Sequence, residues 1–377
     1  MLKRLGDTCT FVGGGTPSKK NPDFYKGSIP WATVRDMNVR VIETTEHSIT
    51  PEAVRQSATN IIPNGEIVIS THVGLGKVCF LGQDTAINQD LKAVIPNGEL
   101  SRRYLYYWFI SKTDELIANG KGATVKGVTL DFVKNLKIQV LTEREQKVVS
   151  DTLDKVYNVI ELADAQVSRL NQLVKSRFVE MFGDLNGSSF PRSTIGEVCE
   201  VKSGGTPDRK VREYWENGDI PWVKTTELKN CELYDSEEHI TSLAMNESSA
   251  KLVPPETILL AMYGQGRTRG MTAKLKIAAA TNQACACILP GSKVDQDYLW
   301  HYLVLSYEKI RALAQGAGQP NLNGKMIRSF GFPLPPLALQ REFAAFVVKV
   351  DKLAFAARRR RDVARQLYRA KIQEFFG

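Results

Sequence analysis

The sequence predicts an α+β fold in which two homologous domains, each mixed but largely β, are separated by two long antiparallel coiled-coil helices. Three observations support this prediction: an internal repeat, short β-branched runs within each repeat, and a long amphipathic tail after each. We expect a first domain over residues 1–141, a central helix over 142–186, a second domain over 187–336 and a C-terminal helix over 337–377. Because the repeated halves can pair through their tails, we also expect pseudo-twofold symmetry.

Six short motifs recur in the same order in the two halves of the chain. The offset between copies drifts only from 190 to 194 residues, which indicates a tandem duplication. The pairs are GGGTP at 13–17 with SGGTP at 203–207, IPW at 29–31 with IPW at 220–222, Ile-Thr at 49–50 with 240–241, GLGK at 74–77 with GQGR at 264–267, Asn-Gln at 88–89 with 282–283, and Tyr-Leu at 104–105 with 298–299.

Within each repeat, β-branched runs are interrupted by Gly, Pro and Asn, as in strands joined by turns. Residues 66–71 (EIVIST) and 256–264 (ETILLAMYG) are examples. The aromatic, amphipathic stretches 104–118 and 298–314 end at Gly-rich segments and predict helices that run into loops. Each domain is therefore expected to be largely β, with a flanking helix and long loops.

The tails predict two long helices. Residues 143–182 contain no Gly or Pro, Thr142 and Glu145 fit a capping box, and Gly183 fits a C-terminal stop. Apolar side chains alternate spacings of four and three in both tails, although Arg361 and Lys371 interrupt the second. The helices can pair within the chain, and an intermolecular coiled coil is the alternative. The expected seam consists of Leu153, Val156, Ile160, Ala163, Val167, Leu170, Val350, Ala354, Ala357 and Ala364.

The net charge of +9 is concentrated at the carboxyl end of the chain. Residues 337–377 carry 10 basic and 4 acidic side chains, whereas residues 184–336 are balanced at 17 of each. A basic surplus suits a polyanionic partner, because neutralised phosphates release their condensed counterions. Since no apolar run reaches the ~18 residues of a membrane span and no secretory signal is recognisable, we expect a cytoplasmic protein.

No motif predicts catalysis, a metal or a cofactor. The Gly-rich segments at 13–15 and 74–77 lack the Gly-Lys-Ser/Thr ending of a phosphate-binding loop. NPDF at 21–24 lacks the second proline of the Asn-Pro-Pro-aromatic tetrad of amino-methyltransferases. The four histidines and six cysteines show no metal-ligand spacing, so we expect buried free thiols. The chemistry is therefore expected to come from partners.

Two homologous domains, each opening with a (S/G)GGTP loop and an IPW segment and each followed by a long helix, resemble the specificity subunit of type I restriction-modification systems. The resemblance covers nearly the whole chain. It implies that each domain is a target recognition domain that reads half of a bipartite double-stranded DNA site. It also implies that the helices form a spacer, and that the subunit docks two methyltransferase subunits and, through them, the motor-nuclease restriction subunits.

Two other hypotheses remain: a stand-alone bivalent DNA-binding regulator, and a methyltransferase with a fused recognition domain. The regulator would act as a lone dimer, whereas the methyltransferase would have to bind a cofactor with this chain alone. A specificity subunit would instead be found together with a separate methyltransferase. These partners therefore distinguish the three hypotheses.

Base edges are read by bidentate donors and acceptors on loops, whereas phosphates accept Lys, Arg, Ser and Thr. Trp31 and Trp222 are expected in the core. The two Asn-Gln pairs are expected in structural turns, while their placement after strands leaves a base-reading role open. The basic run 358–361 is a candidate for phosphate or partner contact. The expected DNA contacts are Lys19, Lys20, Thr33, Arg35, Thr71, His72, Lys77 and Lys126 in the first domain, and Arg209, Lys210, Lys224, Thr225, Tyr263, Gln265, Arg267, Arg269, Asn321 and Lys325 in the second.

Overall fold

The computed structural model describes residues 1–122, 127–185, 187–264, 266–314 and 321–377. These residues fall into two compact units. Unit 1 consists of Met1–Asp164 together with Arg358–Gly377, and unit 2 consists of Ala165–Ala357. Each unit therefore contains one repeat and a portion of both long helices.

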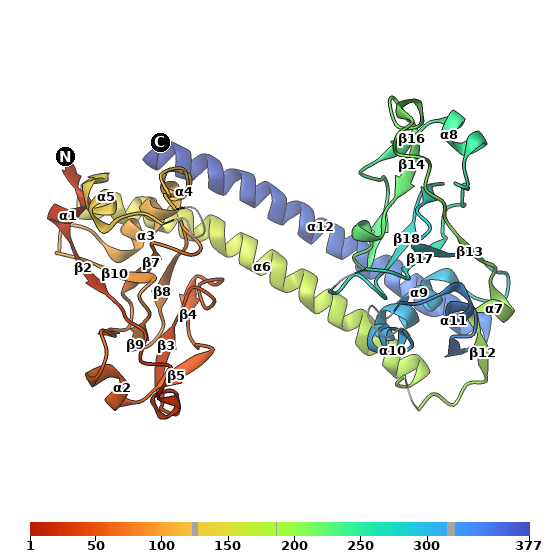
Figure 1. Cartoon of the computed structure of the whole chain (residues 1–377), viewed down its shortest axis with the longest axis horizontal. Helices are drawn as coiled ribbons and strands as arrows, with labels where there is room; N and C mark the ends of the chain where they lie inside the picture. Colours follow the sequence, from red (N-terminus) through yellow and green to blue (C-terminus); the bar gives the residue numbers. More distant parts are fainter. Residues whose placement is uncertain (123–126, 186, 265, 315–320) are drawn as a thin grey trace. The chain divides into compact units, whose positions relative to one another are not determined.

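Unit 1 contains a five-stranded sheet in the order β2-β10-β7-β8-β4, a four-stranded sheet in the order β5-β3-β9-β6, and the pair β1-β11 (Figure 1). The expected mixed, largely β domain is confirmed. Its elements are β1 (Leu2–Arg4), α1 (Leu5–Thr8), β2 (Cys9–Gly13), η1 (Pro22–Tyr25), β3 (Ile29–Ala32), β4 (Val41–Ile42), β5 (His47–Ile49), α2 (Pro51–Arg55), β6 (Ile61–Ile62), β7 (Ile67–Ser70), β8 (Val78–Leu81), β9 (Thr85–Ile87), β10 (Leu91–Pro96), α3 (Arg102–Ser111), α4 (Thr113–Ala118), α5 (Leu130–Asn135) and β11 (Lys137–Gln139).

Unit 2 repeats this plan with sheets β13-β20-β17-β18-β15, β16-β14-β19 and β12-β21. The central strand β14 pairs antiparallel with β16 and parallel with β19, as β3 does with β5 and β9. The elements are β12 (Arg192–Thr194), α7 (Ile195–Val198), β13 (Val201–Ser203), η2 (Arg212–Tyr214), β14 (Ile220–Val223), η3 (Thr225–Glu227), β15 (Cys231–Leu233), β16 (His239–Ile240), α8 (Ser242–Glu247), β17 (Ile258–Ala261), β18 (Thr272–Leu275), β19 (Ala280–Thr281), β20 (Cys285–Ile288), α9 (Gln296–Leu305), α10 (Tyr307–Ala312), α11 (Gly324–Arg328) and β21 (Gly331–Pro333).

The predicted strands and helices are present, with one difference. The runs EIVIST and ETILLAMYG form β7 and β17, whose four residues are all buried, as continuous apolar runs require. Each amphipathic stretch, however, forms two helices rather than one. The breaks fall at Lys112 (φ −92°, ψ 2°) and Ser306 (φ −85°, ψ 10°), whose backbone torsions depart from the helical values.

The long tails form α6 (Glu143–Phe182) and α12 (Leu337–Phe376). The predicted capping box is present, because the Thr142 N–H donates to Glu145 Oε2 at 2.9 Å and the Glu145 N–H donates to Thr142 Oγ1 at 3.3 Å. Gly183 takes the left-handed φ of +82° that ends a helix. Of the seam residues, Val156, Val167 and Leu170 are half-buried; Leu153, Ile160, Ala163, Val350, Ala354, Ala357 and Ala364 are buried.

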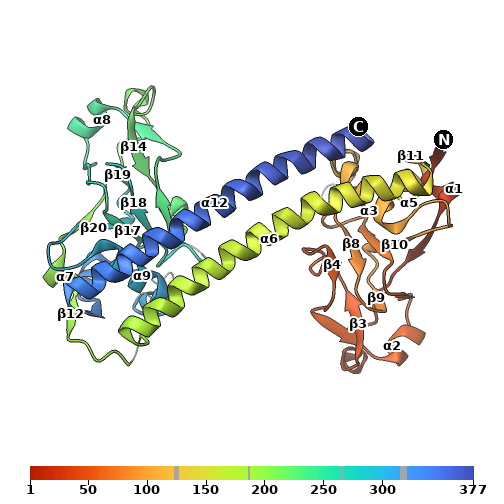
Figure 2. The same ribbon diagram turned by 180° about the vertical axis from the view of Figure 1, so that it is seen from behind.

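In unit 1 the two helices run antiparallel. Tyr157 contacts Tyr368, with ring centroids 6.1 Å apart, while Asp164, later on α6, accepts from Arg361, earlier on α12, at 3.1 Å. Arg361 was expected to interrupt the apolar seam, and this ion pair provides its counter-charge. Helix α3 lies between the sheet and this end of α6 (Figure 2), where its aromatic side chains share a core with Val149.

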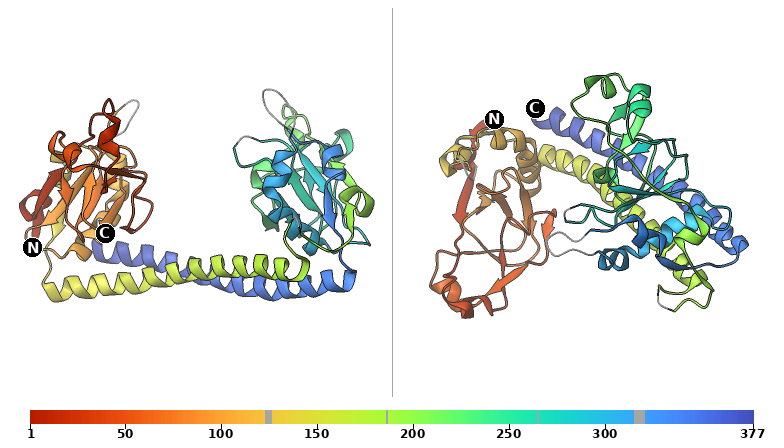
Figure 3. Two further views of the ribbon diagram at one scale, coloured as in Figure 1. Left: turned by 90° about the horizontal axis from the view of Figure 1, so that it is seen from below. Right: turned by 45° about the vertical axis from the view of Figure 1, so that its right-hand side comes forward.

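In unit 2 the other ends of the helices build an aromatic core. Phe178 of α6 packs against Phe343 of α12 and Tyr298 of α9, with ring centroids 5.3 and 5.5 Å away. Arg177 donates to Glu342 at 3.0 Å beside this core. Within each unit, taken by itself, the strands lie to one side of that unit's portions of α6 and α12 (Figure 3). The loops at the end of each unit that lies away from its helix portions are therefore available to contact other molecules.

All six cysteines are free; five are buried and Cys231 is half-buried, close to expectation. Among the residues that the structure describes, no helix is long and apolar enough to cross a membrane. The same residues include no group of three or more His, Cys, Asp or Glu side chains arranged to hold a metal ion.

Candidate nucleic-acid interface

The repeated Gly-Gly pair lies where a loop passes directly over its neighbours. A Cβ atom on Gly14 would overlap the carbonyl oxygen of Ile87, and one on Gly15 would lie 2.6 Å from the carbonyl carbon of Ala58. In unit 2, Gly204 and Gly205 are enclosed in the same way. Only glycine permits such close approach of two backbones, so the motif serves the shape of the loop.

A buried tryptophan donates a hydrogen bond to each of these loops. Trp31 Nε1 donates to the Gly15 carbonyl oxygen at 3.2 Å, and Trp222 Nε1 donates to that of Gly205 at 2.9 Å. Both indoles are buried, which confirms the expectation that they are core residues. Their N–H groups find the partners that buried indoles require.

The Asn-Gln pairs also stabilise these loops through hydrogen bonds. The hydroxyl of Thr16 donates to Gln89, and that of Thr206 donates to Gln283. Asn88 Oδ1 accepts from the backbone N–H of Asp90 at 3.1 Å, which makes a side-chain-stabilised turn. Three of the repeated motifs thus form one scaffold, which we call the loop site of each unit.

The loop site of unit 1 borders a depression of about 750 Å³. The predicted residues Lys19, Thr33 and Arg35 all line it. Asp36 orients this segment, because its carboxylate accepts from the Thr33 N–H at 2.7 Å. The complete lining is Thr16, Lys19, Pro22, Tyr25, Trp31, Thr33, Val34, Arg35, His47, Asn88, Gln89 and Asp90.

Two other candidates of the first domain, Lys77 and His72, lie beside this depression. Lys77 Nζ donates to the Val34 carbonyl at 3.4 Å, and His72 Nδ1 lies 3.9 Å from the Asp90 carboxylate. Lys77 and His72 therefore lie next to residues that line the depression. Of the remainder, Lys20 is exposed, Thr71 is buried with its hydroxyl on the Asp90 carbonyl, and Lys126 lies outside the described residues.

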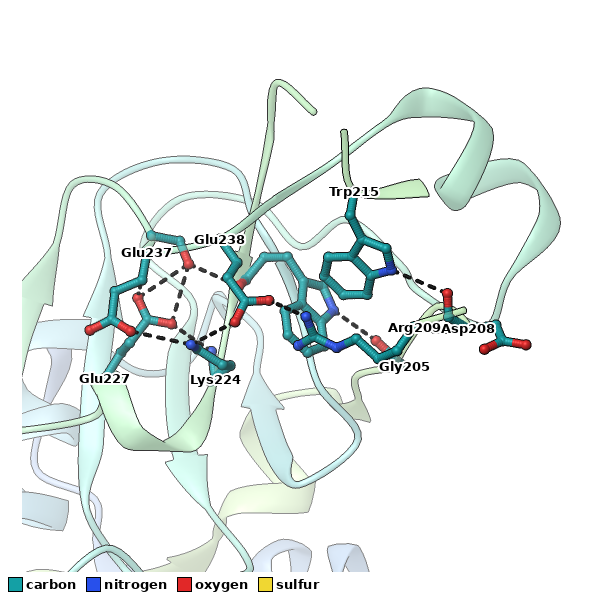
Figure 4. A network of polar contacts seen from close by, with 10 residues as sticks. Gly205, Asp208, Arg209, Trp215, Lys224, Glu227, Glu237 and Glu238 are labelled. Carbon is teal, nitrogen blue, oxygen red and sulfur yellow. Dashed lines mark hydrogen bonds and ion pairs between the residues drawn. The ribbon is translucent and has the colours of Figure 1, made fainter. Parts of the chain in front are cut away.

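The loop site of unit 2 carries an ion-pair cluster on the same scaffold (Figure 4). The carboxylate of Glu238 accepts hydrogen bonds from Arg209 and from Lys224, whose Nζ is 2.7 Å away. Lys224 Nζ is also 3.2 Å from Glu237. Two predicted DNA contacts, 15 positions apart in the sequence, are thus joined by a carboxylate between them.

Arg209 is also held against two indole rings. Its guanidinium carbon lies 3.8 Å from the ring centroid of Trp215 and 4.8 Å from that of Trp222. Both distances are within the ~6 Å of a cation–π contact. The two indoles meet edge to face, at 5.0 Å and 86°, and Trp215 Nε1 donates to the Asp208 carbonyl at 3.1 Å.

The charges of the cluster reinforce one another. Partial burial by itself would raise the pKa of Glu238, but hydrogen bonds from Lys224 and Arg209 hold that pKa below its ordinary value. The hydrogen bond to Glu238 in turn raises the pKa of Lys224. Glu227 fixes the backbone beneath, accepting from the Lys224 N–H at 2.8 Å. Glu238 and Lys224 therefore both stay ionised at neutral pH.

The remaining candidates of the second domain lie on several segments. Tyr263, Arg267 and Arg269 belong to the loop between β17 and β18, which α10 braces: Tyr307 donates to the Arg267 carbonyl at 2.7 Å and Arg311 to that of Arg269 at 3.0 Å. The other placements are Lys210 and Lys325, exposed; Thr225 and Asn321, half-buried; and Gln265, outside the described residues.

Sequence reasoning did not nominate Glu238, Trp215 or His47. A carboxylate is a poor candidate for a DNA surface until its cations are known, and Trp215 lies in a segment, REYW, that has no motif of its own. The repeat contained the signal, because aligning the two halves on IPW places His47 at the position of Glu238.

In the basic run 358–361, Arg361 pairs with Asp164, while Arg358, Arg359 and Arg360 are exposed.

A family model described as the type I restriction modification DNA specificity domain matches residues 1–172 and again 189–363. The chain belongs to this family. The two matches follow the two repeats, and the predicted resemblance to a type I specificity subunit is confirmed. Because its relatives are specificity subunits, which are non-catalytic, the prediction that the chain is not itself an enzyme is also confirmed.

Individual relatives agree with this assignment. The chain is 25% identical over 376 residues to the type I restriction enzyme MjaIX specificity subunit of Methanocaldococcus jannaschii, covering 92% of this chain and 85% of that protein. Over 160 residues, covering 41% of this chain and 40% of the relative, it is 34% identical to the EcoR124I/EcoR124II specificity subunit of Escherichia coli.

Solved structures share the fold. The type I restriction-modification S subunit from M. genitalium superposes with a TM-score of 0.63 at 14% identity, covering 100% of this chain and 96% of that one. A chain from a study of complex assembly and conformational transition of the type I system gives 0.58 at 18% identity, with 100% and 97% covered. The predicted fold class is therefore confirmed.

Proposed function

We propose that this specificity-family chain reads a bipartite double-stranded DNA site, one half with each loop site, and acts in the cytoplasm. It directs the methylation of that site by docking two methyltransferase subunits and, through them, the restriction subunits.

One observation carries this proposal: the two loop sites share a scaffold and differ in the polar side chains mounted on it. Gly15 and Gly205 accept from equivalent tryptophans, yet the residue four positions later on the loop is Lys19 in one unit and Arg209 in the other. DNA readout needs rigidly held side chains that can form hydrogen bonds with base edges, and two different half-sites need two different sets.

The long helices support the docking part of the proposal. Large apolar side chains project from them into solvent: Leu162 is 70% exposed and Val363 59% in unit 1, while Phe355 is 65% exposed in unit 2. Single exposed apolar residues are ordinary on a protein surface. Their position on elements that are not needed for base readout makes these helices suitable for protein partners.

Methylome sequencing of the host with and without this gene tests the function. We expect a bipartite methylated motif that disappears with the gene and returns on complementation. Replacing residues 187–336 with the second domain of another family member should then change one half of the motif only. A motif that changes in both halves, or no gene-dependent motif at all, would contradict the proposal.

Affinity purification of the chain from the same host tests the docking. A methyltransferase subunit should co-purify with it in a stable complex. A chain that purifies alone as a DNA-binding dimer would instead favour a stand-alone regulator.

A further inference from the structure

We propose that Arg209 reads a guanine in the half-site of the second domain, and that Glu238 is its positioning residue. The inference rests on the proposed function and assigns one base contact within it.

The structure restrains Arg209 in several independent ways. Glu238 accepts from its Nη1, and the indoles of Trp215 and Trp222 lie against the guanidinium. The segment that leads into it is fixed at two points, because Gly205 accepts from Trp222 at 2.9 Å and Asp208 from Trp215 at 3.1 Å. A long flexible side chain is thereby placed before any ligand arrives, which lowers the entropic cost of binding.

The guanidinium is oriented but not enclosed, since half of the Arg209 side chain is exposed. A guanidinium has five N–H donors, so the contact from Nη1 to Glu238 leaves others available for a ligand. The bidentate fit of this fork to O6 and N7 of guanine in the major groove is the most frequent specific contact between proteins and DNA.

The charge balance favours a base over a phosphate. Arg209 and Lys224 face two carboxylates, those of Glu237 and Glu238, so the four side chains carry no net charge together. A phosphate contact depends on positive charge, which the carboxylates cancel. A base contact depends on the direction of the donors, which the same carboxylate fixes.

The first unit shows that this arrangement is not a requirement of the fold. In unit 2 the backbone N–H of Trp222 donates to the Glu238 carbonyl at 2.9 Å. In unit 1 the equivalent Trp31 pairs with His47 in the register of β3 and β5. His47 thus occupies the place of Glu238, as Lys19 does that of Arg209. The scaffold folds without the Arg-carboxylate pair, so the pair is available to serve recognition in the second half-site.

The test uses the assembled methyltransferase complex containing full-length chain, with methylome sequencing and binding to duplexes that carry each base at each position of the second half-site. Arg209→Lys keeps the charge and removes the fork. We expect it to reduce discrimination for guanine at one position by about 10- to 100-fold, with the first half-site unchanged. Glu238→Gln should relax the same position, with an unchanged melting temperature.

Arg212→Lys, the same substitution at an exposed arginine three positions further along the chain, is the matched control and should leave the motif intact. Two results would overturn the inference: an unaltered second half-site in Arg209→Lys, or weaker binding to every sequence with a shallower salt dependence, which marks a phosphate contact. If the wild-type complex has no bipartite motif, the proposed function itself fails. If the wild-type complex has a bipartite motif and Arg209→Lys leaves its second half-site unaltered, only the inference about Arg209 fails.

Discussion

Asp154 of helix α6 accepts a hydrogen bond from the guanidinium of Arg40, a residue that precedes strand β4 by one position. The side chain of Arg40 is 19% exposed and lies 4.9 Å from the ring centroid of Tyr157. Tyr107 of α3 donates its hydroxyl to the same carboxylate. The pair ties the sheet of unit 1 to the long helix, across 114 positions of sequence.

Asp154→Asn is expected to destabilise unit 1 by about 2–4 kcal/mol, because it leaves a largely buried guanidinium without its counter-charge. The measurement is the urea midpoint of the full chain. Asp151→Asn is the control: Asp151 is 40% exposed and accepts from Arg103 at 2.7 Å, so its loss should cost under ~1 kcal/mol. Equal effects of the two variants would show that the Arg40 pair contributes little.

The same carboxylate gives a pH dependence of defined sign. Burial would raise the pKa of Asp154, but hydrogen bonds from Tyr107 and Arg40 lower it below its ordinary value. A depressed pKa in the folded state stabilises the fold above the ordinary carboxyl pKa of about 4, and this contribution is lost as the pH falls further. The free energy of unfolding of Asp154→Asn should therefore fall less steeply below about pH 4 than that of the wild type.

Two adjacent glycines of the first loop should respond differently to alanine. In Gly14→Ala the new methyl group would overlap the Ile87 carbonyl, so we expect a loss of about 1–3 kcal/mol in unfolding free energy. A Cβ on Gly13 would meet nothing closer than Lys92 Nζ, at 3.8 Å, and Gly13→Ala should be neutral or slightly stabilising. Equal melting temperatures would show that the loop can move aside.

Lys19 and Lys20 are expected to contact phosphate. The double variant Lys19→Ala, Lys20→Ala should weaken binding to all DNA sequences and reduce the slope of log affinity against log salt by up to about 2. Lys26→Ala is the matched control, because Lys26 is already paired with Asp23 at 2.8 Å. An unchanged slope in the double variant would rule out both lysines as phosphate contacts.

The helices are expected to set the gap between the half-sites. Four residues inserted between Asp164 and Ala165, and four between Ala357 and Arg358, add about one turn, or ~6 Å, to each helix. These positions keep Asp164 and Arg361 together in unit 1. At ~3.4 Å per base pair, the gap in the methylated motif should lengthen by one or two base pairs.

Two-residue insertions at the same places are the control, since they rotate the seam by roughly 200° and should abolish activity. Should the four-residue variant methylate the original spacing, the helices do not act as the ruler.

The sequence by itself determined the features that depend on local pattern. The repeat, the strands β7 and β17, the bounds of α6, the capping box of Thr142 and Glu145, and the core positions of Trp31 and Trp222 could all be predicted. Each follows from periodicity, from the backbone preferences of Gly, or from comparison of the two halves. These signals lie within a few residues of one another or occur twice, and family membership followed from the same repeated motifs.

Which side chains meet depends on packing between segments that are distant in the sequence. Lys224 was nominated as a DNA contact, but its pairing with Glu238 depends on the register of β14 against β16, which no local pattern reports. Arg40 and Asp154 meet because α3 packs between the sheet and α6. The energy of an ion pair depends on distance in space and on burial, and both are set by packing between segments far apart in the chain. The fold could therefore be predicted from the sequence, whereas the charge arrangement of the loop sites could not.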